Sequence, residues 1–119
     1  MSVTFCIYDP EANRLVGEDD FVNLANDNAR DLLEWLGLND DPYLTGSHDA
    51  DDLIARCRRR LWDVPRNHDP ELPRVEERPL AHATYIFPGR RPGYLREKTQ
   101  LLLELAEKAK EGGYRISWG

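Results

Sequence analysis

An amphipathic pattern of 18 residues near the carboxyl terminus, residues 94–111, sets the framework for the fold. Its apolar positions recur at helical spacing and predict one buried helix face. That face comprises Leu95, Thr99, Leu102, Ala106 and Ala109, widened by Leu103 and Leu105. Pro92 suits the first turn of this helix, and Gly112 with Gly113 ends it. Residues 81–87 and 114–118 are typical of strands, so the pattern predicts a strand–helix–strand unit with a right-handed parallel crossover.

Extended segments precede the first predicted helix. Residues 2–8 are rich in β-branched and aromatic side chains and stop at Asp9-Pro10, a turn signal. Residues 14–16 and 21–24 are shorter extended candidates, and the first of them would form a hairpin with the opening strand. We therefore predict one strand and a short hairpin in this part of the chain.

Two further helices are predicted before the middle of the chain. In the first, Asn26 or Asp27 caps an apolar run that continues to Leu36, and Gly37 ends it. The second begins near residue 47 or 49 and ends at Trp62. Its apolar stripe predicts a buried face made of Leu53, Ile54, Cys57 and Leu61.

Residues 63–79 show no periodicity and contain four prolines, so we expect a proline-rich irregular segment there. A long irregular segment in a small domain is commonly functional or mobile. The elements together predict a single globular domain over residues 1–119. Its fold class is α+β, a small two-layer domain in which about three main strands, one terminal β-α-β unit included, pack with three helices.

Composition excludes several classes of protein. The 119 residues are 40% hydrophobic, enough for one buried core. No stretch approaches the roughly 18 apolar residues of a membrane span, and the amino terminus lacks the basic and apolar regions of a signal peptide. Two cysteines, Cys6 and Cys57, are too few for a disulfide scaffold or a four-cysteine zinc site. We therefore expect a soluble, cytoplasmic protein that does not associate with a membrane.

The net charge of −6 conceals an uneven distribution of charge along the chain. Residues 1–55 carry 13 acidic side chains against two arginines, whereas residues 56–98 carry 11 basic side chains against six acidic ones. Acidic and basic residues that meet in the fold would explain this division. Alternatively, the surface is bipolar and has a basic patch for an anionic partner.

The segment that joins the strand at 81–87 to the long helix is the best candidate for a binding site. Helix amino termini present unpaired N–H groups and a partial positive charge, which together bind anions. We predict an anion-binding loop for phosphate or carboxylate made of Gly89, Arg90, Arg91, Gly93 and Tyr94. The segment lacks the phosphate-binding motifs of nucleotide enzymes, and a simple proline-glycine turn with solvated arginines is the alternative.

A second candidate surface combines arginines with amides. Arg56, Arg59 and Arg60 lie near the end of the second predicted helix, where cations also suit the helix dipole. Asn23 and Asn26 lie at a strand-to-helix junction, where such side chains commonly bond to local backbone. If these arginines and amides have a role beyond local stabilisation, they form an interaction surface for an acidic partner or line a cleft.

No motif indicates catalysis, a metal or a cofactor. His48, Asp49, Asp51 and Asp52 are suitable ligand types, but their spacing matches no known metal site. Cys6 and Cys57 fall on predicted buried faces, where a thiol is usually inert. We therefore predict no catalytic residues, no metal and no cofactor, and leave open whether the protein is an enzyme.

These observations favour a small, non-enzymatic binding, adaptor or inhibitor-type protein that acts through a bipolar surface. We expect a protein partner or self-association. Nucleic acid is disfavoured because nucleic-acid-binding domains are usually basic overall. The alternative is a protein that binds a phosphate-bearing ligand such as a nucleotide, or a small phosphate-ester enzyme, which uses the loop at residues 89–94.

Overall fold

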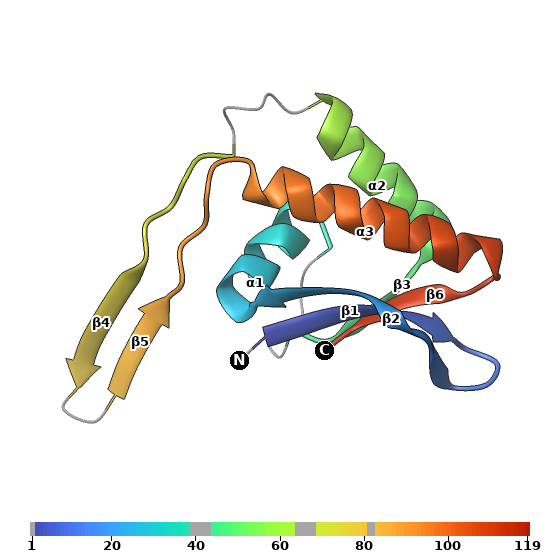
Figure 1. Cartoon of the computed structure of the whole chain (residues 1–119), viewed down its shortest axis with the longest axis horizontal. Coiled ribbons are helices and arrows are strands. Elements are labelled where there is room, and N and C mark those ends of the chain that lie inside the picture. The colour runs from blue at the N-terminus through green and yellow to red at the C-terminus, as the bar shows by residue number, and fades with distance from the viewer. Residues whose placement is uncertain (1, 39–43, 64–68, 81–82) are drawn as a thin grey trace.

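The computed structural model describes residues 2–38, 44–63, 69–80 and 83–119. Four strands form the main sheet in the order β2-β1-β6-β3, and all neighbours are antiparallel (Figure 1). These strands are β1 (Ser2–Asp9), β2 (Arg14–Ala25), β3 (Gly46–Asp49) and β6 (Arg115–Trp118). The helices are α1 (Asn26–Trp35), α2 (Ala50–Asp63) and α3 (Tyr94–Glu111). The predicted α+β class with three helices is therefore confirmed, although the described residues contain more strands than the three expected.

The three helices cover one face of the sheet (Figure 1). The side chains on that face are buried and form the core together with the helices; those from the sheet are Val3, Phe5, Ile7, Val22, Leu24 and Ile116. Every residue of the helix face predicted for 94–111 is buried as well, and the bounds of α3 agree with the prediction. The opposite face of the sheet carries Thr4, Cys6 and Phe21, and no element among the described ranges covers it.

β2 joins the two short extended candidates into one strand. The pairing of β1 with β2 shifts register between Cys6 and Ile7, because Cys6 lies opposite Phe21 and Ile7 lies opposite Val16. Residues 17–20 therefore bulge out of β2. Gly17 begins this bulge with a φ of 76°, a left-handed conformation that glycine adopts without strain.

The cap expected for the first helix was wrong, whereas one of the two starts expected for the second helix was confirmed. The N-cap of α1 is Ala25, and no side chain caps this helix, so Asn26 is already its first helical residue. Of the two residues near which the second helix was expected to begin, Ser47 lies within the edge strand β3 beside β6. Asp49 ends that strand, and α2 begins directly after it at Ala50. Asp49 Oδ2 accepts the N–H of Asp52 in the first turn of α2 at 3.0 Å, as an N-cap side chain does.

Strands β4 (Val75–Leu80) and β5 (Ala83–Phe87) form a separate antiparallel hairpin that extends away from the main sheet (Figure 1). The radius of gyration of 15.3 Å exceeds the about 13.5 Å expected for a compact domain of this length. The expected parallel crossover is wrong, because β5 pairs with its neighbour in sequence and β6 lies antiparallel between β1 and β3. Residues 81 and 82 of the predicted strand lie outside the described residues.

The predicted irregular segment at 63–79 is shorter than expected. β4 begins at Val75, and Leu72 forms an isolated antiparallel bridge with Arg90 at the base of the hairpin. Residues 64–68 of the segment lie outside the described ranges. None of the helices within those ranges has the length and apolar character needed to span a bilayer.

Candidate functional site

The predicted anion-binding loop is held against α1 by its own first arginine. Arg90 Nη1 donates to Asp31 Oδ2 at 2.6 Å and lies 3.3 Å from Asn28 Oδ1. The side chain of Arg90 is only 9% exposed. Asn28, which is buried, also donates from Nδ2 to the carbonyl of Gly89 at 3.2 Å. The guanidinium is thus already paired with a carboxylate of the protein.

The amino terminus of α3 also holds an anion of the chain itself. Asp69 is 1% exposed, and its Oδ2 accepts the N–H of Arg96 in the first turn of α3 at 2.9 Å. The carbonyl of Asp69 accepts the N–H of Gly93, the N-cap residue, at 2.9 Å. A carboxylate at this position complements the positive end of the helix dipole. Asp69 therefore takes the place that the sequence suggested for a bound phosphate.

Arg91 points away from Arg90. It forms an ion pair with Glu97, and its guanidinium lies 5.4 Å from the ring centre of Tyr94. Lys98 also approaches this ring, at 5.5 Å. Burial is the main cause that raises the pKa of the Tyr94 phenol above its ordinary value. Tyr94 thus lies beside two cations, Arg91 in the loop before α3 and Lys98 within α3.

These contacts weigh against the anion-binding hypothesis, which stays a prediction. Arg90 and Arg91 diverge, the first toward α1 and the second toward α3. The buried amide of Asn28 bonds to the loop, whereas Asn23 and Asn26, the amides named from the sequence, have no hydrogen bond to it among the described residues. Asn23 lies on the opposite side of the sheet, where its Nδ2 donates to Ser2 Oγ and Thr4 Oγ1.

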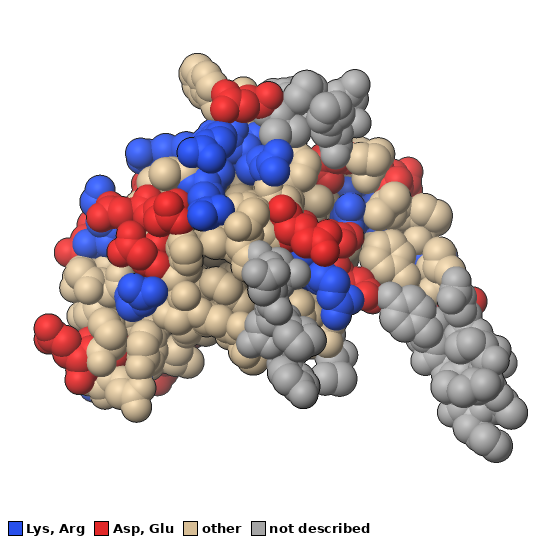
Figure 2. Space-filling view, turned by 180° about the vertical axis from the view of Figure 1, so that it is seen from behind, with Lys and Arg blue, Asp and Glu red and all other residues tan. Residues whose placement is uncertain are grey.

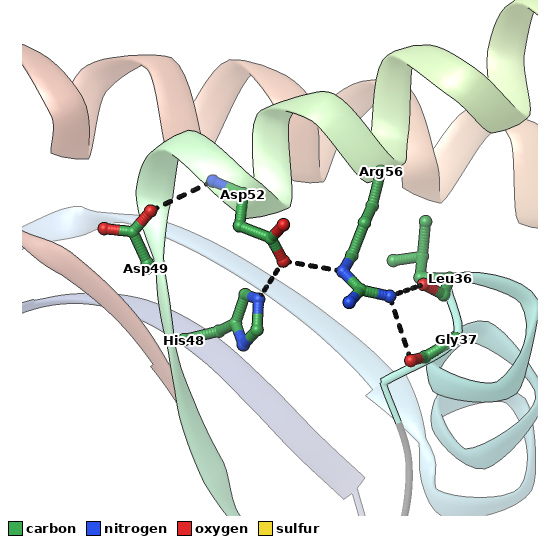
Figure 3. A network of polar contacts seen from close by, with 6 residues as sticks. All are labelled: Leu36, Gly37, His48, Asp49, Asp52 and Arg56. Atoms are coloured by element: carbon green, nitrogen blue, oxygen red, sulfur yellow. Dashed lines mark hydrogen bonds and ion pairs between the residues drawn. The ribbon is translucent and has the colours of Figure 1, made fainter.

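Two of the three arginines predicted for an interaction surface make contacts within the protein. Arg56 Nε donates to Asp52 at 2.6 Å, and Arg56 Nη1 donates to the carbonyls of Leu36 and Gly37 at 3.0 Å each (Figure 3). Arg56 thereby links the end of α1 to α2. Arg60 lies over the ring of Trp35, 5.3 Å from its centre. Both side chains therefore stabilise the packing of α1 against α2.

The carboxylate of Asp52 lies between the ring of His48 and Arg56 (Figure 3). Hydrogen bonds from His48 and then from Arg56 lower the pKa of this carboxyl below its ordinary value. The ionised form is favoured in the folded state, so its contribution to stability is present above the unfolded pKa. That contribution is lost as the pH falls through the lower, folded pKa.

We therefore expect Asp52→Asn to be less stable than the wild type at pH 6 by about 0.5 to 1 kcal/mol, since the network is largely exposed. Urea unfolding should show this difference shrinking on acidification below about pH 3.9, the ordinary pKa of Asp. Glu34→Gln removes an exposed carboxylate of α1 and serves as the control. If the stability difference between Asp52→Asn and the wild type stayed the same at low pH, the ionised Asp52 carboxylate would not be its source.

The third arginine, Arg59, belongs to an open groove between α2 and α3. The groove has a volume of about 720 Å³ and is lined by Ala55, Arg58, Arg59, Leu61, Trp62 and Asp63 of α2 and by Gln100 and Leu103 of α3. We call it the Trp62 groove. The side chain of Trp62 is 90% exposed. Figure 2 shows basic side chains gathered over the carboxyl-terminal end of α2.

The charges of the Trp62 groove are only weakly satisfied within the protein. Arg58 lies 3.8 Å from Glu107, and both side chains are largely exposed, a geometry that contributes little. Arg59 has no ion pair with any of the described residues. The groove therefore combines an exposed tryptophan with two arginines, the residue types that most often dominate binding energy at protein interfaces.

Neither cysteine is a candidate nucleophile. Cys57 is buried in the core, and burial raises the pKa of its thiol to about 12. Burial also raises the pKa of Cys6 on the open face of the sheet. Within the described ranges, no three side chains of the metal-binding types come together.

The sequence arguments gave no binding role to Trp62, Asp31 or Asp69. A signal for Trp62 exists, because Ala55, Arg58, Arg59 and Trp62 recur at helical spacing on the side of α2 away from Leu53 and Cys57. Tryptophan on an otherwise polar helix face is the informative feature. No local signal identifies Asp31 or Asp69, since Asp31 meets Arg90 across 59 positions and Asp69 meets Arg96 across 27.

No family model matches the chain, and no curated protein or solved structure shows a significant similarity to it.

Proposed function

We propose that the protein is a non-enzymatic, cytoplasmic binding module that docks onto an acidic surface of a partner protein through the Trp62 groove. The observation that carries this proposal is the 90% exposure of Trp62 beside Arg58 and Arg59. Leaving a large aromatic side chain in water forgoes the favourable burial of its apolar area. A partner that covers the groove recovers this free energy.

The charge of the groove selects the class of partner. Arg58 and Arg59 extend from adjacent positions of α2 and favour carboxylates, which their planar guanidinium groups bind in a bidentate manner. Nucleic acid is disfavoured, because the chain carries a net charge of −6 and Asp63 also lines the groove. An acidic protein segment fits both the aromatic and the basic side chains.

Trp62→Ala should weaken binding of polyglutamate, used as an acidic polypeptide probe, by at least about tenfold, because buried tryptophans are typical interface hot spots. Arg58→Glu with Arg59→Glu should abolish binding, and high salt should weaken binding by the wild type. Binding is measured by biolayer interferometry on immobilised polyglutamate.

Leu101→Ala is the matched control, because Leu101 is a partly exposed apolar residue of α3 that does not line the groove. It should bind as the wild type does. Equal affinities of the wild type and Trp62→Ala would contradict the proposal. A single-stranded oligonucleotide that bound more tightly than polyglutamate would also overturn it, in favour of nucleic acid.

A further inference from the structure

The open face of the sheet contains a pocket where the bulge of β2 leaves β1. The pocket has a volume of about 360 Å³ and is lined by Thr4, Cys6, Leu15, Glu18, Asp20 and Phe21, among others. We call it the sheet pocket. Leu15 and Phe21 are 62% and 56% exposed, so an apolar surface lies open at a place where the described elements provide no cover.

The rim of the sheet pocket is acidic. Residues 17–20 form the bulge, and Glu18 and Asp20 of the bulge line the pocket, whereas Asp19 between them lines a separate hollow beside α3. Asp20 accepts a hydrogen bond from Lys108 at 2.9 Å, which also raises the pKa of that lysine. Glu18 is exposed and has no ion pair with the described residues. Two acidic residues thus lie at the rim of an apolar pocket, and one of them is already paired with Lys108.

The Trp62 groove has the complementary chemistry. It presents one exposed aromatic side chain beside two arginines and one acidic residue, Asp63, whereas the sheet pocket presents an apolar hollow lined also by the acidic residues Glu18 and Asp20. The pocket is of a size to receive one large aromatic side chain. Aromatic insertion between matched opposite charges is the arrangement that stabilises many protein interfaces.

The two surfaces lie on opposite sides of the same molecule. α2 belongs to the layer of helices, and the sheet pocket lies on the face of the sheet that those helices leave open (Figure 1). One copy therefore cannot bring the two together. Two copies can, and the pair would still present one unused groove on one copy and one unused pocket on the other.

We propose that the partner of the Trp62 groove is a second copy of this chain, with Trp62 of one copy inserted in the sheet pocket of the next. Arg58 and Arg59 then face Glu18 and Asp20, the acidic residues that line the pocket. Because different surfaces meet, the contact is heterologous and assembles the copies head to tail into rings or chains. This inference rests on the proposed function, since it uses the same groove and names its partner.

Sedimentation velocity of the full chain over a range of concentrations tests the inference. At low ionic strength the wild type should form species larger than the monomer, and high ionic strength should shift it toward the monomer. Trp62→Ala should weaken association by at least about tenfold. Glu18→Lys with Asp20→Lys, and separately Arg58→Glu with Arg59→Glu, should each sediment as monomers.

Mixing the two charge-reversed variants gives the most specific result. In the mixture, the pocket that carries lysines in one variant meets the groove that carries glutamates in the other. Association should therefore return, although neither variant associates alone. Glu34→Lys with Glu71→Lys makes the same change of net charge at exposed sites outside both surfaces and should associate as the wild type does. Circular dichroism confirms that each variant is folded.

Failure to restore association on mixing would overturn the head-to-tail contact. A wild type that stays monomeric but binds polyglutamate through Trp62 would overturn the second copy as partner and leave the proposed function standing. A monomeric wild type that does not bind polyglutamate would overturn both.

Discussion

Replacing Asp31 by Ala should lower the free energy of unfolding by about 2 to 3 kcal/mol. The substitution leaves the guanidinium of Arg90, whose side chain is 9% exposed, without its carboxylate at 2.6 Å. Removing one partner of a buried ion pair costs about 3 to 5 kcal/mol, and the 37% exposure of Asp31 reduces this figure. Urea unfolding followed by circular dichroism measures the change.

The matched control for this prediction lies on the same helix. Asp27 pairs with the exposed Arg30 at 3.4 Å, so Asp27→Ala should cost at most about 1 kcal/mol. If instead Asp31→Ala proved neutral, and inorganic phosphate stabilised the wild type, Arg90 would be available to an external anion. This result would support the hypothesis of a phosphate site at residues 89–94.

Replacing Gly89 by Ala should lower the free energy of unfolding by about 2 to 5 kcal/mol, because two penalties combine. The φ of 76° disfavours any residue with a Cβ. In addition, the new Cβ would lie 2.7 Å from the carbonyl oxygen of Leu72 and 2.7 Å from the backbone nitrogen of Arg74. These are backbone atoms at the base of the β4–β5 hairpin, so they cannot rotate away.

Gly93→Ala separates the two penalties. Gly93 has a similar φ of 74°, but no atom lies within 4 Å of the position that its Cβ would take. This variant should cost only about 1 to 2 kcal/mol. Thermal unfolding of both variants compares them directly, and equal losses would show that Leu72 and Arg74 do not constrain the loop as the structure indicates.

The parts of the fold that depend on local pattern could be predicted from the sequence. The bounds and buried face of α3 follow from the spacing of its leucines and alanines, and Gly112 ends it as expected. The position of β6 could not be predicted in this way. It lies between β1 and β3, and strand order depends on contacts between segments far apart in the chain.

The same division holds for the candidate sites. The sequence indicated a basic loop at a helix amino terminus, which the structure contains. It could not indicate that Asp31 and Asp69, from distant segments, already neutralise Arg90 and the first turn of α3. The exposure of Trp62 could not be predicted either. The sequence shows on which face of a helix a residue lies, but not whether another element covers that face.

We expect the protein to bind its partner through the Trp62 groove and not through the loop at residues 89–94. Amide chemical shifts measured during titration with polyglutamate distinguish these two surfaces. The largest changes should fall on Arg58, Arg59 and Trp62 of α2 and on Gln100 and Leu103 of α3. Changes concentrated on Gly89, Arg90 and Arg91, with α2 unaffected, would contradict the claim.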